Sequence, residues 1–108
     1  MNAERYEIYY ADLSPAVGGE ISKVGPAVVV SRTRMNQYPD TAVVCPLTTR
    51  LHPRWRSRIQ ISSAGKDAEI AVDRIRSISK KRLKRRIDTF APDRASELRS
   101  LINEMYGQ

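Results

Sequence analysis

The sequence predicts one mainly β domain, in which about five to seven short strands form a small barrel or a strongly bent sheet before a C-terminal helix. Short β-branched or aromatic stretches alternate with turns rich in Gly, Pro and Ser. The residues after Pro92 carry the clearest helical spacing of the chain. A length of 108 residues suits a single domain, residues 1–108, with one modest core.

Three strands are predicted in the first half of the chain. Residues 6–13 are rich in Tyr and Ile, and residues 26–31 begin with a proline and continue as an apolar run. Residues 41–48 form the third strand, where Pro46 implies a bulge or an edge position because proline cannot donate to the ladder. The loop before Pro26 contains paired glycines, which permit backbone angles that other residues avoid.

The second half continues the sheet and ends in the helix. Residues 58–61 alternate polar and apolar and predict a fourth strand, with a turn over residues 62–66. Residues 69–78 form a fifth stretch, and residues 87–90 are a candidate to return to the sheet. One apolar stripe marks the helix, formed by Ala95, Leu98, Leu101, Ile102 and Met105.

Flanking residues support the boundaries of this helix. Proline suits a first helical turn, so Pro92 marks the start. Asp93 and Glu97 complement the positive end of the helix dipole. Gly107 is a suitable C-terminal stop.

Composition excludes several classes of protein. No apolar run approaches the roughly 18 residues that cross a membrane, and the N-terminus lacks the apolar core of a signal peptide. One cysteine and one histidine form no ligand cluster, so we expect neither a metal nor another cofactor. Cys45, which cannot form an internal disulfide, fits a core position in a protein of a reducing cytoplasm.

Positive charge is concentrated in one third of the chain. Residues 50–86 contain 13 Lys or Arg and 3 acids, whereas the rest of the chain contains 6 basic and 9 acidic residues. Such a region attracts polyanions, above all nucleic acid. A solvated basic face with no partner is the alternative.

Several short motifs occur in a characteristic order. Gly18-x-Glu20 precedes Gly25-Pro26-Ala27-Val28-Val29-Val30-Ser31, and Pro46-Leu47-Thr48-Thr49 follows. Asp73-Arg74-Ile75-Arg76-Ser77-Ile78, Lys81-Arg82-Leu83 and the helix after Pro92 complete the set. In this order and spacing the chain resembles the MazF/PemK/Kid family of toxin endoribonucleases over nearly its whole length.

The resemblance implies a small SH3-like β-barrel that forms a homodimer and is the toxin of a type II toxin–antitoxin system. Members cleave single-stranded RNA, including mRNA, at short sequences without a metal. A ribose 2′-hydroxyl attacks the adjacent phosphate. A small antitoxin neutralises the toxin, and the acidic, partly disordered antitoxins of the family suit a chain of net charge +7.

The family's catalytic residues map onto two positions. An arginine directly before the proline of the second strand supplies donors that match phosphate geometry. Gly25 occupies that position here, so the resemblance implies an inactivated or weakened copy unless another cation such as Lys23 compensates. Thr48 matches the assisting threonine at the end of the third strand, although a β-branched residue is also ordinary in a strand.

Further residues are predicted to bind RNA, each with a structural alternative. Glu20 could accept from a base amino group or be a solvated loop carboxylate, and Asp73 could bind RNA or pair with Arg74 or Arg76. The predicted RNA-binding set is Gly19, Glu20, Lys23, Thr49, Arg50, Asp73 and Arg74.

Two aromatic positions stay open at this point. Trp55 lies between Arg54 and Arg56, an arrangement that suits base stacking against a single strand but also packing over the barrel or at a dimer interface. His52 is the only histidine, which excludes two-histidine RNA cleavage within one chain. Two other functions remain as alternatives, namely a non-catalytic nucleic-acid binder and a gyrase-poison-like toxin of the same fold.

Overall fold

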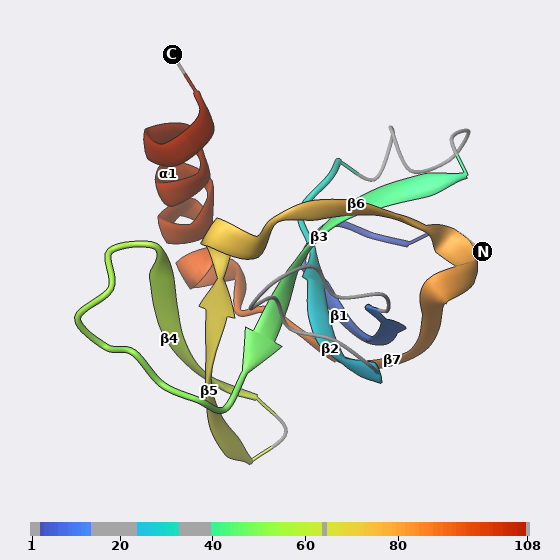
Figure 1. The fold of residues 1–108 in the computed structure, drawn as a ribbon, viewed down its shortest axis with the longest axis horizontal. Helices are drawn as coiled ribbons and strands as arrows, with labels where there is room; N and C mark the ends of the chain where they lie inside the picture. The colour runs from blue at the N-terminus through green and yellow to red at the C-terminus, as the bar shows by residue number, and fades with distance from the viewer. Residues whose placement is uncertain (1–2, 14–23, 33–39, 64, 108) are drawn as a thin grey trace.

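The computed structural model describes residues 3–13, 24–32, 40–63 and 65–107. Seven antiparallel strands curl into a half-barrel, and one helix follows them, which confirms the predicted mainly β class (Figure 1). The elements are β1 (Glu7–Asp12), β2 (Val24–Val29), β3 (Thr41–Thr48), β4 (Arg58–Ser63), β5 (Lys66–Ala71), β6 (Arg76–Ser79), β7 (Leu83–Thr89) and α1 (Ala95–Tyr106).

Strand β3 is the centre of the sheet. The strands follow the order β4-β5-β3-β2-β1-β7, and β6 joins the edge of β3 that β5 also uses. Residues 41–44 of β3 pair with β6, and residues 47 and 48 pair with β5. The other edge of β3 pairs with β2. In Figure 1, β3 accordingly runs between the β4–β5 hairpin and the remaining strands.

Several predicted elements are wrong in their extent. β2 begins and ends two residues before the predicted strand 26–31, and β4 and β5 extend into the predicted turn 62–66. Residues 69–78 are not a continuous stretch, because a short 3₁₀ turn at Val72–Arg74 separates β5 from β6. The break lets the two strands pair with opposite ends of β3. The predicted return of residues 87–90 is confirmed in β7, which begins earlier, at Leu83.

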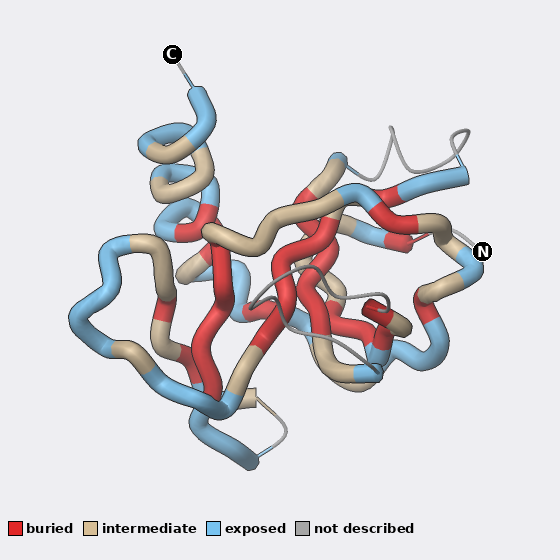
Figure 2. The backbone as a smooth tube through the Cα atoms, viewed as in Figure 1, coloured by how far each residue is buried: buried red, intermediate tan, exposed pale blue. Residues whose placement is uncertain are grey.

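Apolar side chains fill both faces of the sheet. The buried residues along the strands are red in Figure 2. The larger cluster contains Ile8, Val28, Val30, Cys45, Leu47, Ile59, Ile61, Ala68, Ile70, Val72, Phe90 and Leu98. The smaller one contains Ala3, Tyr9, Ala11, Leu13, Ala27, Val29, Val44, Ile78 and Leu83. Because side chains alternate along a strand, β1, β2 and β3 contribute to both clusters. Cys45 is fully buried, as predicted.

The helix packs against the larger cluster. A 3₁₀ turn at Pro92–Arg94 leads into α1, Leu98 is fully buried, and Leu101, Ile102 and Met105 are half-buried against the same core. None of the helices in the described part of the chain is long and apolar enough to cross a membrane.

Candidate active site

Gly25 and Thr48 lie on neighbouring strands of the half-barrel. The ladder between β2 and β3 pairs Ala27 with Pro46, Val28 with Cys45 and Val29 with Val44. The ladder ends at the Ala27–Pro46 pair, two residues short of Gly25 on β2 and of Thr48 on β3. Both predicted catalytic positions therefore lie just past the same end of this ladder.

Neither the backbone nor the space around it requires a glycine at position 25. Among the described residues, only Tyr6 and Gly65 have a positive φ. A Cβ atom built on Gly25 has no described neighbour within 4 Å. An L-residue with a side chain therefore fits this point of β2.

Thr48 ends β3 beside a buried acid. It is half-buried and pairs with Glu69 of β5. Its hydroxyl oxygen accepts a hydrogen bond from the backbone N–H of Arg50 at 3.1 Å, which turns the chain out of the strand. Thr49 and Arg50 follow in an exposed bend, where both side chains can be reached from solvent.

Glu69 is a functional candidate that the sequence analysis missed. Its carboxylate is fully buried. It accepts hydrogen bonds from the His52 backbone N–H at 2.6 Å, from Arg58 Nη1 at 2.6 Å and from Gln60 Nε2 at 2.7 Å. The signal in the sequence is an acid inside the apolar run 68–72, which suits burial only if the acid finds partners.

Asp73 belongs to the same network. Arg58 donates from Nε to Asp73 Oδ1 at 2.7 Å and from Nη2 to Oδ2 at 3.4 Å, and Arg74 Nε lies 3.6 Å from the same Oδ2. The expected structural partner Arg74 is present, but the shorter bonds come from Arg58, fifteen residues away along the chain. The Asp73 side chain keeps 26% exposure, which leaves an accessible edge for a further contact.

Electrostatics keep this network ionised. Burial raises the pKa of Glu69, but hydrogen bonds from Gln60, His52 and Arg58 outweigh it and hold that pKa below its ordinary value. Burial likewise works against the charge of Asp73, and Arg58 again lowers the pKa of that carboxyl. The two carboxylates in turn raise the pKa of Arg58 against the effect of its burial. The two carboxylates therefore stay ionised and hydrogen-bonded, and neither carries a proton that it could donate.

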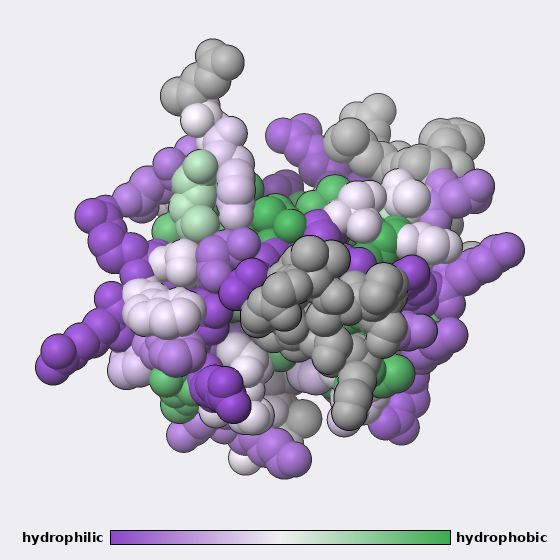
Figure 3. Space-filling model, in the orientation of Figure 1, coloured by the Kyte–Doolittle hydropathy of each residue, from purple (hydrophilic) through white to green (hydrophobic). Residues whose placement is uncertain are grey.

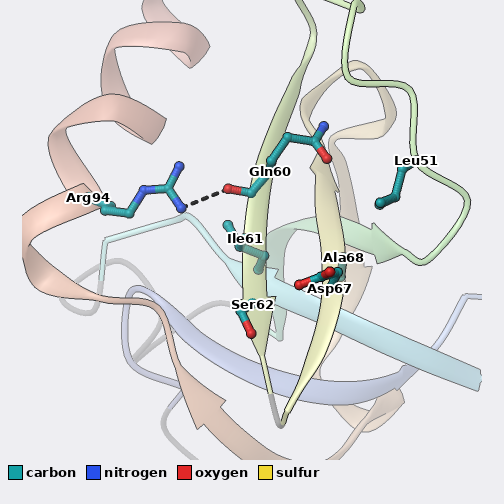
Figure 4. A pocket seen from close by; sticks show the side chains of 7 residues that line it. All are labelled: Leu51, Gln60, Ile61, Ser62, Asp67, Ala68 and Arg94. Atoms are coloured by element: carbon teal, nitrogen blue, oxygen red, sulfur yellow. Dashed lines mark hydrogen bonds between the residues drawn. The ribbon is translucent and has the colours of Figure 1, made fainter.

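A cleft lies over the β4–β5 hairpin, next to this network (Figure 4). Its volume is about 310 Å³, and its lining includes Leu51, Gln60, Asp67 and Arg94. Arg94 Nη1 donates to the Gln60 backbone oxygen at 2.7 Å, as the dashed line in Figure 4 shows. Gln60 thus connects the cleft with the buried Glu69.

Two arginine side chains donate hydrogen bonds to the backbone at the C-terminal end of β1. Arg76 Nη1 donates to the carbonyl oxygen of Leu13 at 2.9 Å, and Arg82 Nη1 donates to that of Asp12 at 3.5 Å. Arg85 lies over the Tyr10 ring at 5.3 Å. Hydrophilic side chains dominate both flanks of the face shown in Figure 3.

Three predicted RNA-binding residues, Gly19, Glu20 and Lys23, lie outside the described residues. Their roles stay predictions. Within the described ranges, no group of three or more His, Cys, Asp or Glu is arranged to hold a metal ion.

Comparisons with known proteins agree on one family. The model of the PemK-like, MazF-like toxin of type II toxin–antitoxin systems matches residues 4–106. An endoribonuclease MazF of Staphylococcus saprophyticus is 28% identical over 108 residues, covering 95% of this chain and 90% of the relative.

Solved structures share the fold. MazF from Deinococcus radiodurans superposes with a TM-score of 0.86 at 19% identity and covers 100% of this chain and 99% of its own. A mycobacterial endoribonuclease in complex with its cognate antitoxin gives a TM-score of 0.80 at 17% identity, covering 97% and 95%. Because the family model spans nearly the whole chain, the chain belongs to the PemK-like and MazF-like toxins of type II toxin–antitoxin systems.

Proposed function

We propose that this chain is a toxin of the class that cleaves single-stranded RNA without a metal, and that Gly25 weakens or abolishes cleavage in this copy. Family membership supports the activity. The observation that carries the site is the β2–β3 register, which runs from Ala27 and Pro46 toward Gly25 and Thr48.

The reaction is an internal transesterification. The ribose 2′-hydroxyl gives up its proton, and its oxygen attacks the adjacent phosphorus. The bond from phosphorus to the 5′-oxygen breaks, and that oxygen takes up a proton. The products are a cyclic phosphate and a 5′-hydroxyl, and no metal or redox partner takes part. Catalysis requires donors around the phosphoryl oxygens and groups that move the two protons.

Position 25 is where the chain lacks such a donor. A guanidinium there would present a planar fork of N–H groups to the phosphate, and glycine presents none. Loss of one donor to a developing charge typically costs about 10²–10³ in rate, and loss of a proton-transferring group adds to this. The surroundings of Gly25 admit a side chain, so the position is open to restoration.

The test restores that side chain. Gly25→Arg, Gly25→Lys and Gly25→Ala are compared on a long single-stranded RNA in EDTA. We expect Gly25→Arg to raise cleavage by at least about 10²-fold, Gly25→Lys to raise it less because an ammonium is a point charge, and Gly25→Ala to leave it unchanged. Cleavage by Gly25→Arg should fall when Thr48→Val is added. A Gly25→Arg protein as inert as its parent would refute the site.

A non-catalytic nucleic-acid binder is the second candidate, and the charge distribution favours it. Residues 50–86 carry 13 basic and 3 acidic side chains. Such a binder would hold RNA with an affinity that falls steeply as salt rises, and no substitution at position 25 would produce cleavage. The restoration experiment therefore separates the two candidates.

The partners in this proposal are an acidic antitoxin and a second copy of the chain, in the bacterial cytoplasm. Two kinds of observation support them. Structural relatives were crystallised with an antitoxin, as in the MazE–MazF complex of Deinococcus radiodurans. On α1, Leu101, Ile102 and Met105 are only half-buried and Tyr106 keeps 51% exposure, which leaves apolar surface for an interface. Light scattering of the purified chain measures whether it dimerises.

A further inference from the structure

Two aromatic rings form an exposed stack in the segment between β3 and β4. The rings of His52 and Trp55 lie 3.8 Å apart between centroids, at an angle of 11°. Trp55 keeps 47% of its surface exposed. It is the one tryptophan of the sequence. The indole ring is therefore accessible from solvent, as is common for tryptophan residues that contact a partner.

The stack is held in place from below. The Arg58 guanidinium lies over the Trp55 ring at 4.6 Å, and its own side chain is 6% exposed. Glu69 accepts a hydrogen bond from the backbone N–H of His52, and the backbone N–H of Trp55 donates to the carbonyl oxygen of His52 at 3.0 Å. Through Arg58 and Glu69, the buried network fixes both ring-bearing residues. A partner that stacks on a fixed ring has little ordering entropy to overcome.

The surroundings favour an anionic chain. Residues 49–57 contain Arg50, Arg54 and Arg56 and no acid. All three arginines are exposed, and Arg56 pairs with Glu104 of α1 at 2.6 Å. Proteins that bind single-stranded nucleic acid combine such cations with aromatic rings on which bases stack.

The stack is also mechanically linked to Thr48. Thr48 pairs with Glu69, and Glu69 binds His52. The segment that carries the rings leaves the sheet directly after Thr48. Glu69 therefore connects Thr48 with the segment that carries the two rings.

We propose that the His52–Trp55 stack is a platform on which an unpaired base of single-stranded RNA stacks, beside the site of Gly25 and Thr48. The proposal rests on the proposed function for its ligand, RNA. Because the His52 ring and the Arg58 guanidinium both lie against the Trp55 ring, the base stacks on the outer face of His52, and Trp55 supports that ring from its other side. The platform contacts the π-face that every base has, so it strengthens RNA binding without selecting one base.

The chain with Gly25 suits the test because it is expected to bind RNA and cut it slowly. A single-stranded oligoribonucleotide is titrated while the emission of the one tryptophan is followed. We expect the RNA to quench Trp55. Binding of a dye-labelled oligoribonucleotide to Trp55→Ala should be about 5- to 150-fold weaker than to the parent. Trp55→Phe keeps a ring and should recover most of the affinity.

Two controls separate stacking from charge and from folding. Pro53→Ala removes an exposed side chain of the same segment without a π-face and should change the affinity less than about twofold. Inorganic polyphosphate carries the charge but no base, so it should bind the parent and Trp55→Ala equally. A lower melting temperature of Trp55→Ala with unchanged RNA affinity would overturn the platform and identify Trp55 as a packing residue.

Failure of the platform differs from failure of the proposed function. If the oligoribonucleotide binds without quenching Trp55 and Trp55→Ala binds it as tightly, the platform is wrong while RNA binding stands. If no RNA binds to the parent at low salt, both proposals fall. Cleavage by Gly25→Arg is measured separately and does not enter these outcomes.

Discussion

Replacing Glu69 by glutamine tests whether the buried network stabilises the fold. The substitution keeps the size and shape of the side chain but replaces one carboxylate oxygen with an NH₂ group. Three donors now point at Glu69, from His52, Arg58 and Gln60. An amide oxygen can accept from two of them, so the NH₂ group faces the third as donor against donor.

The magnitude follows from burial. Removing one partner of a buried ion pair costs about 3–5 kcal/mol, because the other charge stays buried without compensation. Here Asp73 still accepts two hydrogen bonds from Arg58, so the lower end of the range applies, about 3 kcal/mol. For a domain of about this size, 1 kcal/mol shifts the melting temperature by roughly 4–8 °C. We therefore expect Glu69→Gln to melt at least about 12 °C below the parent.

The matched control makes the same chemical change on the surface. Glu104 pairs with Arg56 at 2.6 Å, but their side chains are 55% and 88% exposed. Such a pair contributes at most about 1 kcal/mol, so Glu104→Gln should melt within a few degrees of the parent. Thermal unfolding followed by circular dichroism and Trp55 fluorescence, at one protein concentration, measures both variants. Equal stabilities of Glu69→Gln and Glu104→Gln would refute the argument.

Two further predictions concern titratable groups. The pKa values of Glu69 and Asp73 are lower in the folded protein than the ordinary values of 4.5 and 3.8. Their contribution to stability is therefore fully present above those ordinary values and is lost as the pH falls through the folded-state pKa values. Urea midpoints measured from pH 7 to pH 3 should decline below about pH 4.5, and should decline less in Glu69→Gln. Burial raises the pKa of the Cys45 thiol to about 12, so a colourimetric disulfide reagent at pH 8 should label Cys45 only as fast as the chain unfolds, and rapid labelling in buffer alone would show that β3 is open.

Local patterns predicted the strands whose residues are apolar on their own account. The stretch 41–48 coincides with β3 and the run 26–31 overlaps β2, because an apolar strand core between turn residues has few other conformations. The start of β2 at Val24 was not predicted. The division of 69–78 was not predictable in this way. It depends on which part of β3 each half meets, and that pairing is long-range.

The candidate site divides along the same line. Motif order predicts Gly25 and Thr48 as site residues, but how near they lie to each other depends on how β2 and β3 pair. Glu69 has only an unusual setting within an apolar run, and no local rule pairs it with Arg58. Contacts between side chains far apart in sequence are set by the whole fold.

Strand β3 has no solvent face in its middle, and this has a consequence for folding accuracy. Val44 belongs to one apolar cluster and Cys45 to the other. A one-residue slip normally exposes apolar side chains and is rejected, but here it would exchange one buried face for another. The register of β3 therefore depends on specific backbone hydrogen bonds and on the position of its proline. Pro46 lacks an N–H, and Ser31 Oγ accepts from the Val43 N–H at 3.1 Å. These two features fix the register of β3, and the register in turn sets where Thr48 lies relative to the strand that carries Gly25.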